Sequence, residues 1–153
     1  MTSKKVFLNK TYNAYANREI PEEDVELTHV GPGTPGGEYL RRFWHPVIYI
    51  EELTDVPVAT RILGEDLVVF QDFGGQLGAV QANCPHGKHS LEFGSVCERG
   101  IRCRHGWLID VDGTILETPG EPDDSPLEDR QFHGAYATHE AAGAVFVYMG
   151  PPD

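Results

Sequence analysis

The stretch NCPHGKHSLEFGSVCERGIRCRHGWLID, residues 83–110, contains all three cysteines of the 153-residue chain and three of its seven histidines. The phrase Cys-x-His occurs in it twice, as Cys84-Pro85-His86 and as Cys103-Arg104-His105. Thiolate and imidazole are ligands that zinc, iron and iron–sulfur centres favour in proteins. Two matched pairs so close together therefore predict one metal site to which both pairs contribute.

Each pair lies in a glycine-containing stretch between predicted strands, so we expect each on a loop at the end of a sheet. Residues two apart in an extended loop can point the same way, and one loop can offer a thiolate and an imidazole together. Sixteen residues separate the two pairs, enough for a strand, a turn and a strand that bring the second loop beside the first. The predicted metal ligands are Cys84, His86, Cys103 and His105.

The charge balance excludes some classes of partner. Twelve basic and 24 acidic residues give a net charge of −12, which repels phosphate backbones and anionic lipid. We therefore expect no nucleic-acid or membrane partner. A basic protein or a small soluble partner is compatible with this charge. No apolar run approaches the roughly 20 residues of a membrane span, and residues 1–29 lack the features of a signal peptide. Few cysteines and no leader predict a cytoplasmic protein.

Short segments rich in β-branched and aromatic residues predict an all-β fold, a small antiparallel sandwich or barrel. A hairpin is expected over 107–117, with its tight turn at Asp112-Gly113. Further strands are predicted at 46–50, 59–63, 67–71, 77–81 and 144–149.

The segment before these strands is predicted to be less regular. The sequence GPGTPGG at 31–37 should break any regular element. Residues 38–44 are compatible with one or two helical turns whose Leu40, Phe43 and Trp44 face inward. Trp44 and Trp107 are interpreted as core aromatics. The four histidines without a cysteine nearby are expected to be structural or surface groups: His29, His45, His133 and His139.

At the paired motif the sequence resembles the Rieske iron–sulfur motif, Cys-x-His followed by Cys-x-x-His. The likeness extends to LTHVGPGTPGGEYLRRFWHPV, RILGEDLVVF, SLEFG, ERGIRC, HGWLIDVDGTILETPGEP and VFVYMGPPD. These segments are similar to the amino-terminal domain of Rieske oxygenase large subunits, especially of the phthalate-dioxygenase type. The resemblance implies two small antiparallel sheets and a cluster-binding subdomain. It divides the chain into an arm at 1–30 and a Rieske domain at 31–153, with the subdomain at about 82–110.

The resemblance also implies a [2Fe–2S] cluster in which two cysteines hold one iron and two histidines hold the other. Such a domain passes single electrons from a reductase or ferredoxin to a non-haem iron centre in an oxygenase catalytic domain, in an aromatic-ring hydroxylating family. That catalytic domain is not recognised in these residues. The chain alone is therefore expected to carry electrons and not to oxygenate substrate.

Two departures from the family pattern leave an alternative open. The second pair has one intervening residue where the family has two, which removes up to about 3.3–3.6 Å of reach. The first loop continues as Gly87-Lys88-His89, where the family has Arg-Gly. His89 and Cys97 are thus possible substitute ligands. The alternative function is a non-redox module that holds a single zinc or iron ion through two cysteines and two histidines.

Overall fold

Antiparallel strands form most of the regular structure in the computed structural model, which describes residues 4–5, 9–11, 13–16, 19–85, 89–122 and 132–152. The strands are β1 (Lys4–Lys5), β2 (Glu19–Ile20), β3 (His45–Tyr49), β4 (Val58–Ile62), β5 (Glu65–Gln71), β6 (Leu77–Gln81), β7 (Ser95–Val96), β8 (Ile101–Arg102), β9 (Leu108–Ile109), β10 (Ile115–Glu117), β11 (Ala135–Ala141) and β12 (Ala144–Tyr148). The helical turns are α1 (Asn13–Ala16), α2 (Val25–Thr28), α3 (Pro35–Leu40), η1 (Ile50–Glu52) and η2 (Leu91–Phe93).

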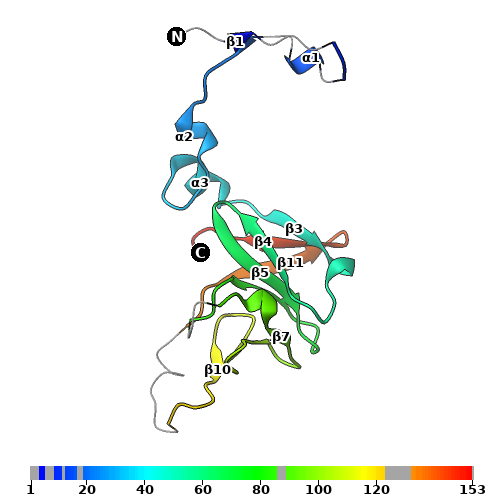
Figure 1. The fold of residues 1–153 in the computed structure, drawn as a ribbon, viewed down its shortest axis with the longest axis vertical. Coiled ribbons are helices and arrows are strands. Elements are labelled where there is room, and N and C mark those ends of the chain that lie inside the picture. The colour runs from blue at the N-terminus through cyan, green and yellow to red at the C-terminus, as the bar shows by residue number, and fades with distance from the viewer. Residues whose placement is uncertain are drawn as a thin grey trace.

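Two sheets build the body of the molecule (Figure 1). The larger has six strands in the order β3-β12-β11-β6-β5-β4, and the smaller has four in the order β10-β9-β8-β7. Every pairing between neighbouring strands is antiparallel. The predicted all-β antiparallel class is confirmed. Within the described residues no helix has both the length and the apolar character needed to cross a membrane.

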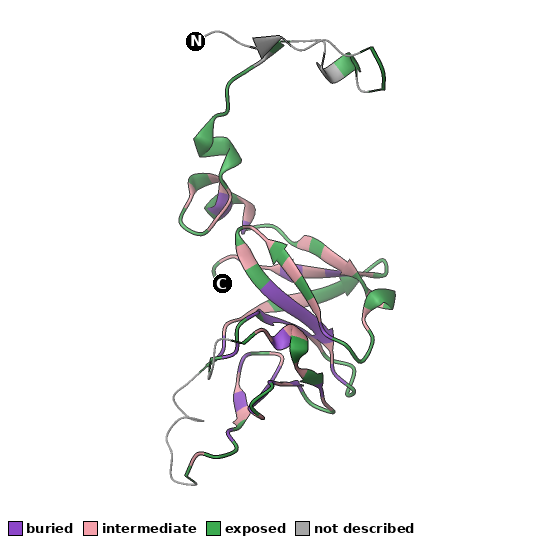
Figure 2. Ribbon diagram, viewed as in Figure 1, coloured by how far each residue is buried: buried purple, intermediate pink, exposed green. Residues whose placement is uncertain are grey.

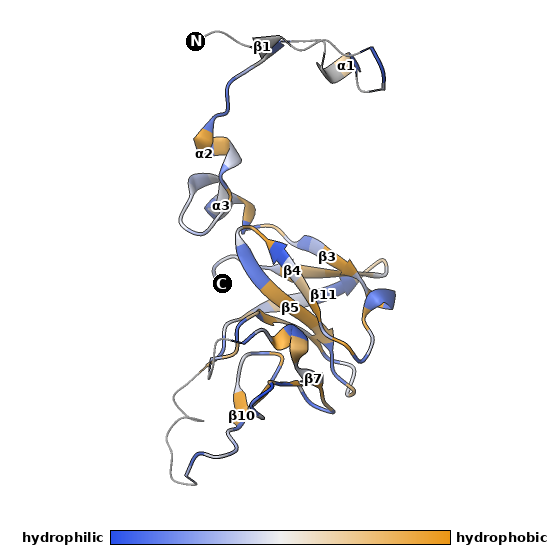
Figure 3. Ribbon diagram, in the orientation of Figure 1, coloured by the Kyte–Doolittle hydropathy of each residue, from blue (hydrophilic) through white to orange (hydrophobic). Residues whose placement is uncertain are grey.

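Strand β5 is buried on both faces, and this explains its continuous apolar run Leu67-Val68-Val69-Phe70. Successive side chains of a strand point to opposite faces. Val68 and Phe70 therefore join one apolar cluster, while Leu67 and Val69 join another. Figure 2 shows the buried stretch on β5, and Figure 3 shows that the same stretch is apolar.

The first cluster lies between the large sheet and the small one. It contains Cys84, Cys103 and Trp107 together with the inward residues of β5, β6, β8 and β9. Trp107 is 3% exposed, which confirms that it is a core aromatic. The second cluster lies on the opposite face of β5 and β6, under β12. The two cysteines therefore sit at the edge of a packed core and not on an isolated loop.

A buried carboxylate fixes the small sheet to the large one. Asp72, which follows β5 and is 4% exposed, accepts hydrogen bonds from the backbone N–H of Gln76 at 2.8 Å and of Gly100 at 3.1 Å. Gly100 has φ +73 in the β7–β8 turn, and a side chain there would overlap the carbonyl oxygen of Ile109. Because charge-assisted hydrogen bonds to a buried carboxylate are strong, they hold this turn against the β5–β6 turn.

The amino-terminal segment corrects one expectation. Residues 31–37 do not break all regular structure, because α3 begins at Pro35 and runs through Gly36 and Gly37. Proline suits the first helical position, and the Thr34 side chain caps the helix by accepting from the Gly37 N–H at 3.1 Å. Figure 1 shows α1 and β1 apart from the sheets.

The inward orientation predicted for residues 38–44 is also wrong for its aromatic residues. Phe43 is 48% exposed and Trp44 is 47% exposed. The Trp44 ring lies on the outer side of the large sheet, 5.5 Å from the ring of Tyr148 and 6.0 Å from that of His139. The inward anchor of this segment is instead Arg41, which is 6% exposed and bonds Glu65 at 3.0 Å.

The predicted strands match β3, β4, β5, β6 and β12 within two residues at each end, and the predicted hairpin contains β9 and β10. Its turn is at Asp112-Gly113: the Gly113 N–H donates to the Asp110 carbonyl at 3.0 Å, and Gly113 has φ +87. Strand β11 was not predicted. It joins β12 to β6 and so closes the large sheet.

A buried histidine should make stability depend on pH. His133 is 5% exposed, and its Nε2 hydrogen-bonds the Gln81 carbonyl at 2.7 Å. Burial lowers its pKa, an effect that this bond only partly opposes. As pH falls through the ordinary histidine value of about 6.5, the unfolded chain binds a proton that the folded chain resists. The free energy of unfolding should therefore fall from about pH 7.5 to about pH 5.5.

Urea unfolding of wild type and His133→Gln at both pH values tests this, because glutamine keeps a donor but does not titrate. His133→Gln should show the smaller loss on acidification. Exposed His139→Gln is the matched control and should behave as wild type. An equal acid loss in wild type and His133→Gln would show that His133 is not responsible.

Candidate metal centre

The first loop follows β6 and is closed by a short antiparallel neck. Asn83 pairs with Ser90 across this neck. On either side of that pair, the Cys84 N–H donates to the His89 carbonyl at 2.9 Å, and the Leu91 N–H donates to the Ala82 carbonyl at 2.6 Å. These backbone bonds fix where Cys84 leaves the sheet. His86, a predicted ligand, lies outside the described residues.

The second loop is a tight turn between β8 and β9. The Cys103 N–H donates to the Trp107 carbonyl at 2.8 Å, and the Gly106 N–H donates to the Cys103 carbonyl at 2.9 Å. Gly106 has φ +94, which favours glycine. Arg102 Nη1 donates to the Gly106 carbonyl at 2.6 Å and so holds the turn from its amino-terminal side. The buried Trp107 ring anchors the other side.

The two loops bring three of the four predicted ligands together. One donor atom from each of Cys84, Cys103 and His105 lies within 4.8 Å of the others. Cys84 is 2% exposed and Cys103 is 6% exposed, whereas His105 is exposed. All three cysteines are free thiols. The centre thus has a buried sulfur side and an open imidazole side.

Electrostatics favours a metal at this position. Burial raises the pKa of the Cys103 thiol, and the neighbouring Cys84 adds to the effect. A buried thiolate pair without a positive charge beside it is therefore unfavourable. A bound cation reverses this preference, because thiolate is the form that ligates. Two sulfurs and an imidazole are donors suited to zinc, iron or an iron–sulfur cluster, so the residues present fit such a group.

The two possible substitute ligands differ in position. Cys97 is half-buried on the small sheet, where its Sγ contacts the Ser95 carbonyl at 3.6 Å, and it is not in the 4.8 Å group. His89 is exposed, and its ring centre lies 5.0 Å from that of His105. Sequence reasoning did not foresee this contact. The register of the neck sets His89 opposite Cys84, and no pattern in the sequence indicates the contact with His105.

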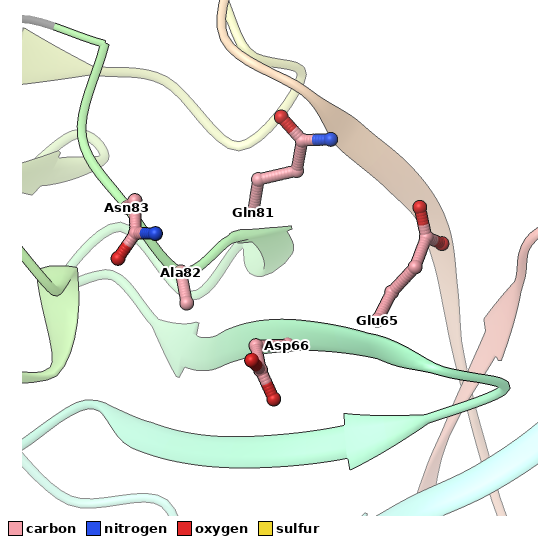
Figure 4. A pocket seen from close by; sticks show the side chains of 5 residues that line it. All are labelled: Glu65, Asp66, Gln81, Ala82 and Asn83. Atoms are coloured by element: carbon pink, nitrogen blue, oxygen red, sulfur yellow. The ribbon is translucent and has the colours of Figure 1, made fainter. Parts of the chain in front are cut away.

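A polar groove lies beside the first loop, lined by Glu65, Asp66, Gln81, Ala82 and Asn83 (Figure 4). Its acidic groups already have partners. Glu65 accepts hydrogen bonds from Arg41 and from the Tyr136 hydroxyl, and Asp66 pairs with Arg61 at 2.7 and 2.8 Å. We assign this groove no ligand.

Comparison with known proteins supplies the family. A sequence model described as "Rieske [2Fe-2S] domain" matches residues 43–136. The chain is 51% identical over 146 residues to the tert-butanol monooxygenase / tert-amyl alcohol desaturase oxygenase subunit of Aquincola tertiaricarbonis, covering 93% of this chain and 31% of that protein. It is 43% identical to the phthalate 4,5-dioxygenase oxygenase subunit of Pseudomonas putida, covering 87% and 31%.

The fold is also similar to that of a solved oxygenase. A solved oxygenase–ferredoxin complex of carbazole 1,9a-dioxygenase contains a chain that superposes with TM-score 0.64 and 29% identity, covering 74% of this chain and 30% of that one. The chain thus spans about a third of the length of the relatives it matches.

Cys84 and Cys103 lie in the candidate metal group and Cys97 does not, so substitution of each cysteine tests the ligand assignment. Cys84→Ser and Cys103→Ser should each lose bound metal, because each removes a buried donor atom from the 4.8 Å group. Loss of partners that only orient a ligand already costs about 10–100-fold in metal affinity, so loss of the ligand itself should cost at least as much. Cys97→Ser is the matched control and should keep wild-type metal content by elemental analysis. A Cys97→Ser protein without metal beside a fully loaded Cys103→Ser protein would refute this assignment.

Proposed function

Since this chain belongs to the Rieske [2Fe–2S] domain family, we propose that it carries single electrons through a metal centre held by its two loops. The observation that carries the proposal is the convergence of Cys84 from the first loop with Cys103 and His105 from the second. When bound, a Rieske cluster takes up and releases one electron, at a potential that imidazole ligands raise to about −150 to +300 mV.

The proposed protein ligands are the two thiolates and two imidazoles. Cys84 and Cys103 supply the sulfur side, and their burial in the apolar cluster keeps water from that side. His105 supplies one imidazole on the solvent side. The second imidazole comes from the first loop, which offers His86 of the motif and His89. Backbone hydrogen bonds position Cys84 at the start of the first loop and Cys103 in the second turn, which supports the proposal.

Electron donors and acceptors can approach the centre from the side of the exposed His105 imidazole. We propose that a reductase or ferredoxin reduces the centre there, and that a non-haem iron oxygenase centre receives the electron. Support comes from the relatives, whose names describe oxygenase subunits, and from a solved structure that contains an oxygenase with its ferredoxin. The net charge of −12 supports the expectation of no nucleic-acid or membrane partner. Three free thiols fit the reducing cytoplasm.

A second candidate function, a mononuclear zinc or iron module, is favoured by one observation. The three donor atoms lie within 4.8 Å of one another. Two ligands on one ion, with bonds of about 2.0–2.3 Å, are never more than about 4.6 Å apart. Separations below 4.8 Å include those that a single ion allows, and the shortened second pair also suits one ion, which needs less reach than two. Such a module would not carry electrons if the ion were zinc.

Metal and sulfide analysis distinguishes the two candidates. The full chain, purified without oxygen, should contain iron and acid-labile sulfide in equal amounts, with little zinc. Dithionite should bleach it by one electron per chain, and air should restore the colour. Reduction should also produce an electron paramagnetic resonance signal. A colourless zinc protein, or iron without sulfide, would contradict the electron-transfer proposal and support the mononuclear one.

A further inference from the structure

We propose that Arg102 is a positioning residue of the metal centre, which restrains the second ligand loop and raises the reduction potential of the bound group through its positive charge. This inference rests on the proposed function, since it concerns a redox group held between the two loops. Arg102 lies directly before Cys103 in the chain, and it is assigned no role as a ligand.

The small sheet holds the backbone of Arg102 on both sides. Arg102 ends β8, the strand between β7 and β9, and it pairs with Ser95 on one side and with Leu108 on the other. Successive side chains of a strand point to opposite faces. The Cys103 side chain belongs to the apolar cluster, so the side chain of Arg102 starts on the other face, where it is 34% exposed.

From that face the guanidinium contacts two further elements. Nη1 donates to the Gly106 carbonyl at 2.6 Å, and Nη2 lies 2.7 Å from the carboxylate of Glu117 at the end of β10. Arginine presents its N–H donors in a rigid planar fork, so one side chain can hold two acceptors in fixed positions. Arg102 therefore links the turn that carries two ligands to the edge strand of the small sheet.

The link acts on the turn at Gly106, the residue after His105. The Gly106 N–H donates to the Cys103 carbonyl at 2.9 Å, and its carbonyl accepts from Arg102, so both polar groups of this residue are bonded. At φ +94 glycine has no side chain that limits backbone rotation, and these two bonds supply the limit. Arg102 thereby restrains a turn that has only one residue between its two ligands.

The same contacts place a positive charge beside the centre. The hydrogen bond with Glu117 raises the pKa of Arg102, so the guanidinium stays protonated. Backbone dimensions put a group bonded to the Gly106 carbonyl within about 9 Å of the His105 Cα. This distance is close to the Debye length of about 8 Å at physiological ionic strength, so salt screens the charge only in part. Reduction adds an electron to the centre, and a nearby positive charge favours the reduced state.

Glu117 carries the opposite charge, and this gives the proposal a sign that can be tested. Its carboxylate is 52% exposed and bonds the same guanidinium. If the two charges act on the centre, loss of the Arg102 charge should lower the reduction potential, and loss of the Glu117 charge should raise it. If the two residues form only a surface ion pair, both losses disturb the same bond, and opposite shifts are not expected.

Four variants of the full chain separate the shape of the loop from the charge. Arg102→Gln is neutral and too short to reach both partners, whereas Arg102→Lys keeps the charge without the planar fork. Glu117→Gln keeps an oxygen that can accept from Arg102 but removes the negative charge. Arg42→Gln is the matched control, because Arg42 is an exposed arginine that follows α3, on the side of the molecule away from β10 (Figure 1).

Wild type and the variants are reconstituted without oxygen, with ferrous iron and sulfide. Iron and sulfide are measured per chain, and stepwise reduction with dithionite and redox mediators, followed by visible absorption, gives each reduction potential. Titration with Co²⁺, whose visible absorption reports binding by thiolate and imidazole, gives the metal affinity. Circular dichroism checks that each variant is folded.

Arg102→Gln should have a lower reduction potential than wild type and should bind Co²⁺ about tenfold more weakly, as expected for loss of a partner that orients ligands. Arg102→Lys should keep a potential near that of wild type while it also binds Co²⁺ more weakly. Glu117→Gln should have a higher potential with full iron content. Arg42→Gln should match wild type in both measurements.

The inference is overturned if Arg102→Gln keeps either the potential or the Co²⁺ affinity of wild type, or if Arg102→Gln and Glu117→Gln shift the potential in the same direction. If Arg102→Gln does not fold or takes up no cluster, the Co²⁺ affinity of Arg102→Lys tests the restraint and the potential of Glu117→Gln tests the charge. Wild type that takes up no iron and sulfide would overturn the proposed function as well, whereas a normal cluster in wild type and all variants would overturn this inference alone.

Discussion

Burial of strand β5 on both of its faces is the constraint on which the rest of the domain depends. One face of Leu67-Val68-Val69-Phe70 packs under β12, and the other packs against the small sheet. A strand buried on both faces cannot shift its register by one residue without exchanging the two clusters. The positions of β6, of the loop that follows it and of Cys84 at the start of that loop are thereby fixed. The metal centre inherits its geometry from this packing.

The centre combines two opposing requirements. Cys84 and Cys103 belong to an apolar cluster, and burial raises the pKa of the Cys103 thiol. A metal requires both as thiolates. The fold resolves the conflict only when a cation replaces the protons, so metal binding and core packing support each other. The backbone bonds beside Cys84 and around Cys103 are formed within the chain and do not depend on the cation.

The sequence predicted much of the fold because β-branched runs are locally recognisable, and residues 77–81 coincide with β6. Strand β11 escaped prediction because AYATHEA is mostly small or polar, and its place is determined by partners on both sides. Helix α3 escaped because Pro35 looks like a breaker but begins the helix under a Thr34 cap.

At the centre, the repeated Cys-x-His phrase predicted that two loops would converge. The proximity of His89 to His105 depends on the register of the neck and on the path of a distant turn, which no local pattern encodes.

The contact between the segment before β3 and the segment after β12, two neighbouring strands, has a consequence for how this unit can be connected to other chains. Gly150 is packed against the carbonyl of Arg41, so the chain enters the sheets and leaves them at neighbouring points. Figure 1 shows this junction near the C-terminus, at the side of the molecule away from β7 and β10. A domain whose two ends lie close together can be inserted into another polypeptide, because the insertion separates the flanking residues of that polypeptide by only a short distance. The two loops of the candidate metal centre are not part of this junction, so a connection made there would leave their backbone bonds unchanged.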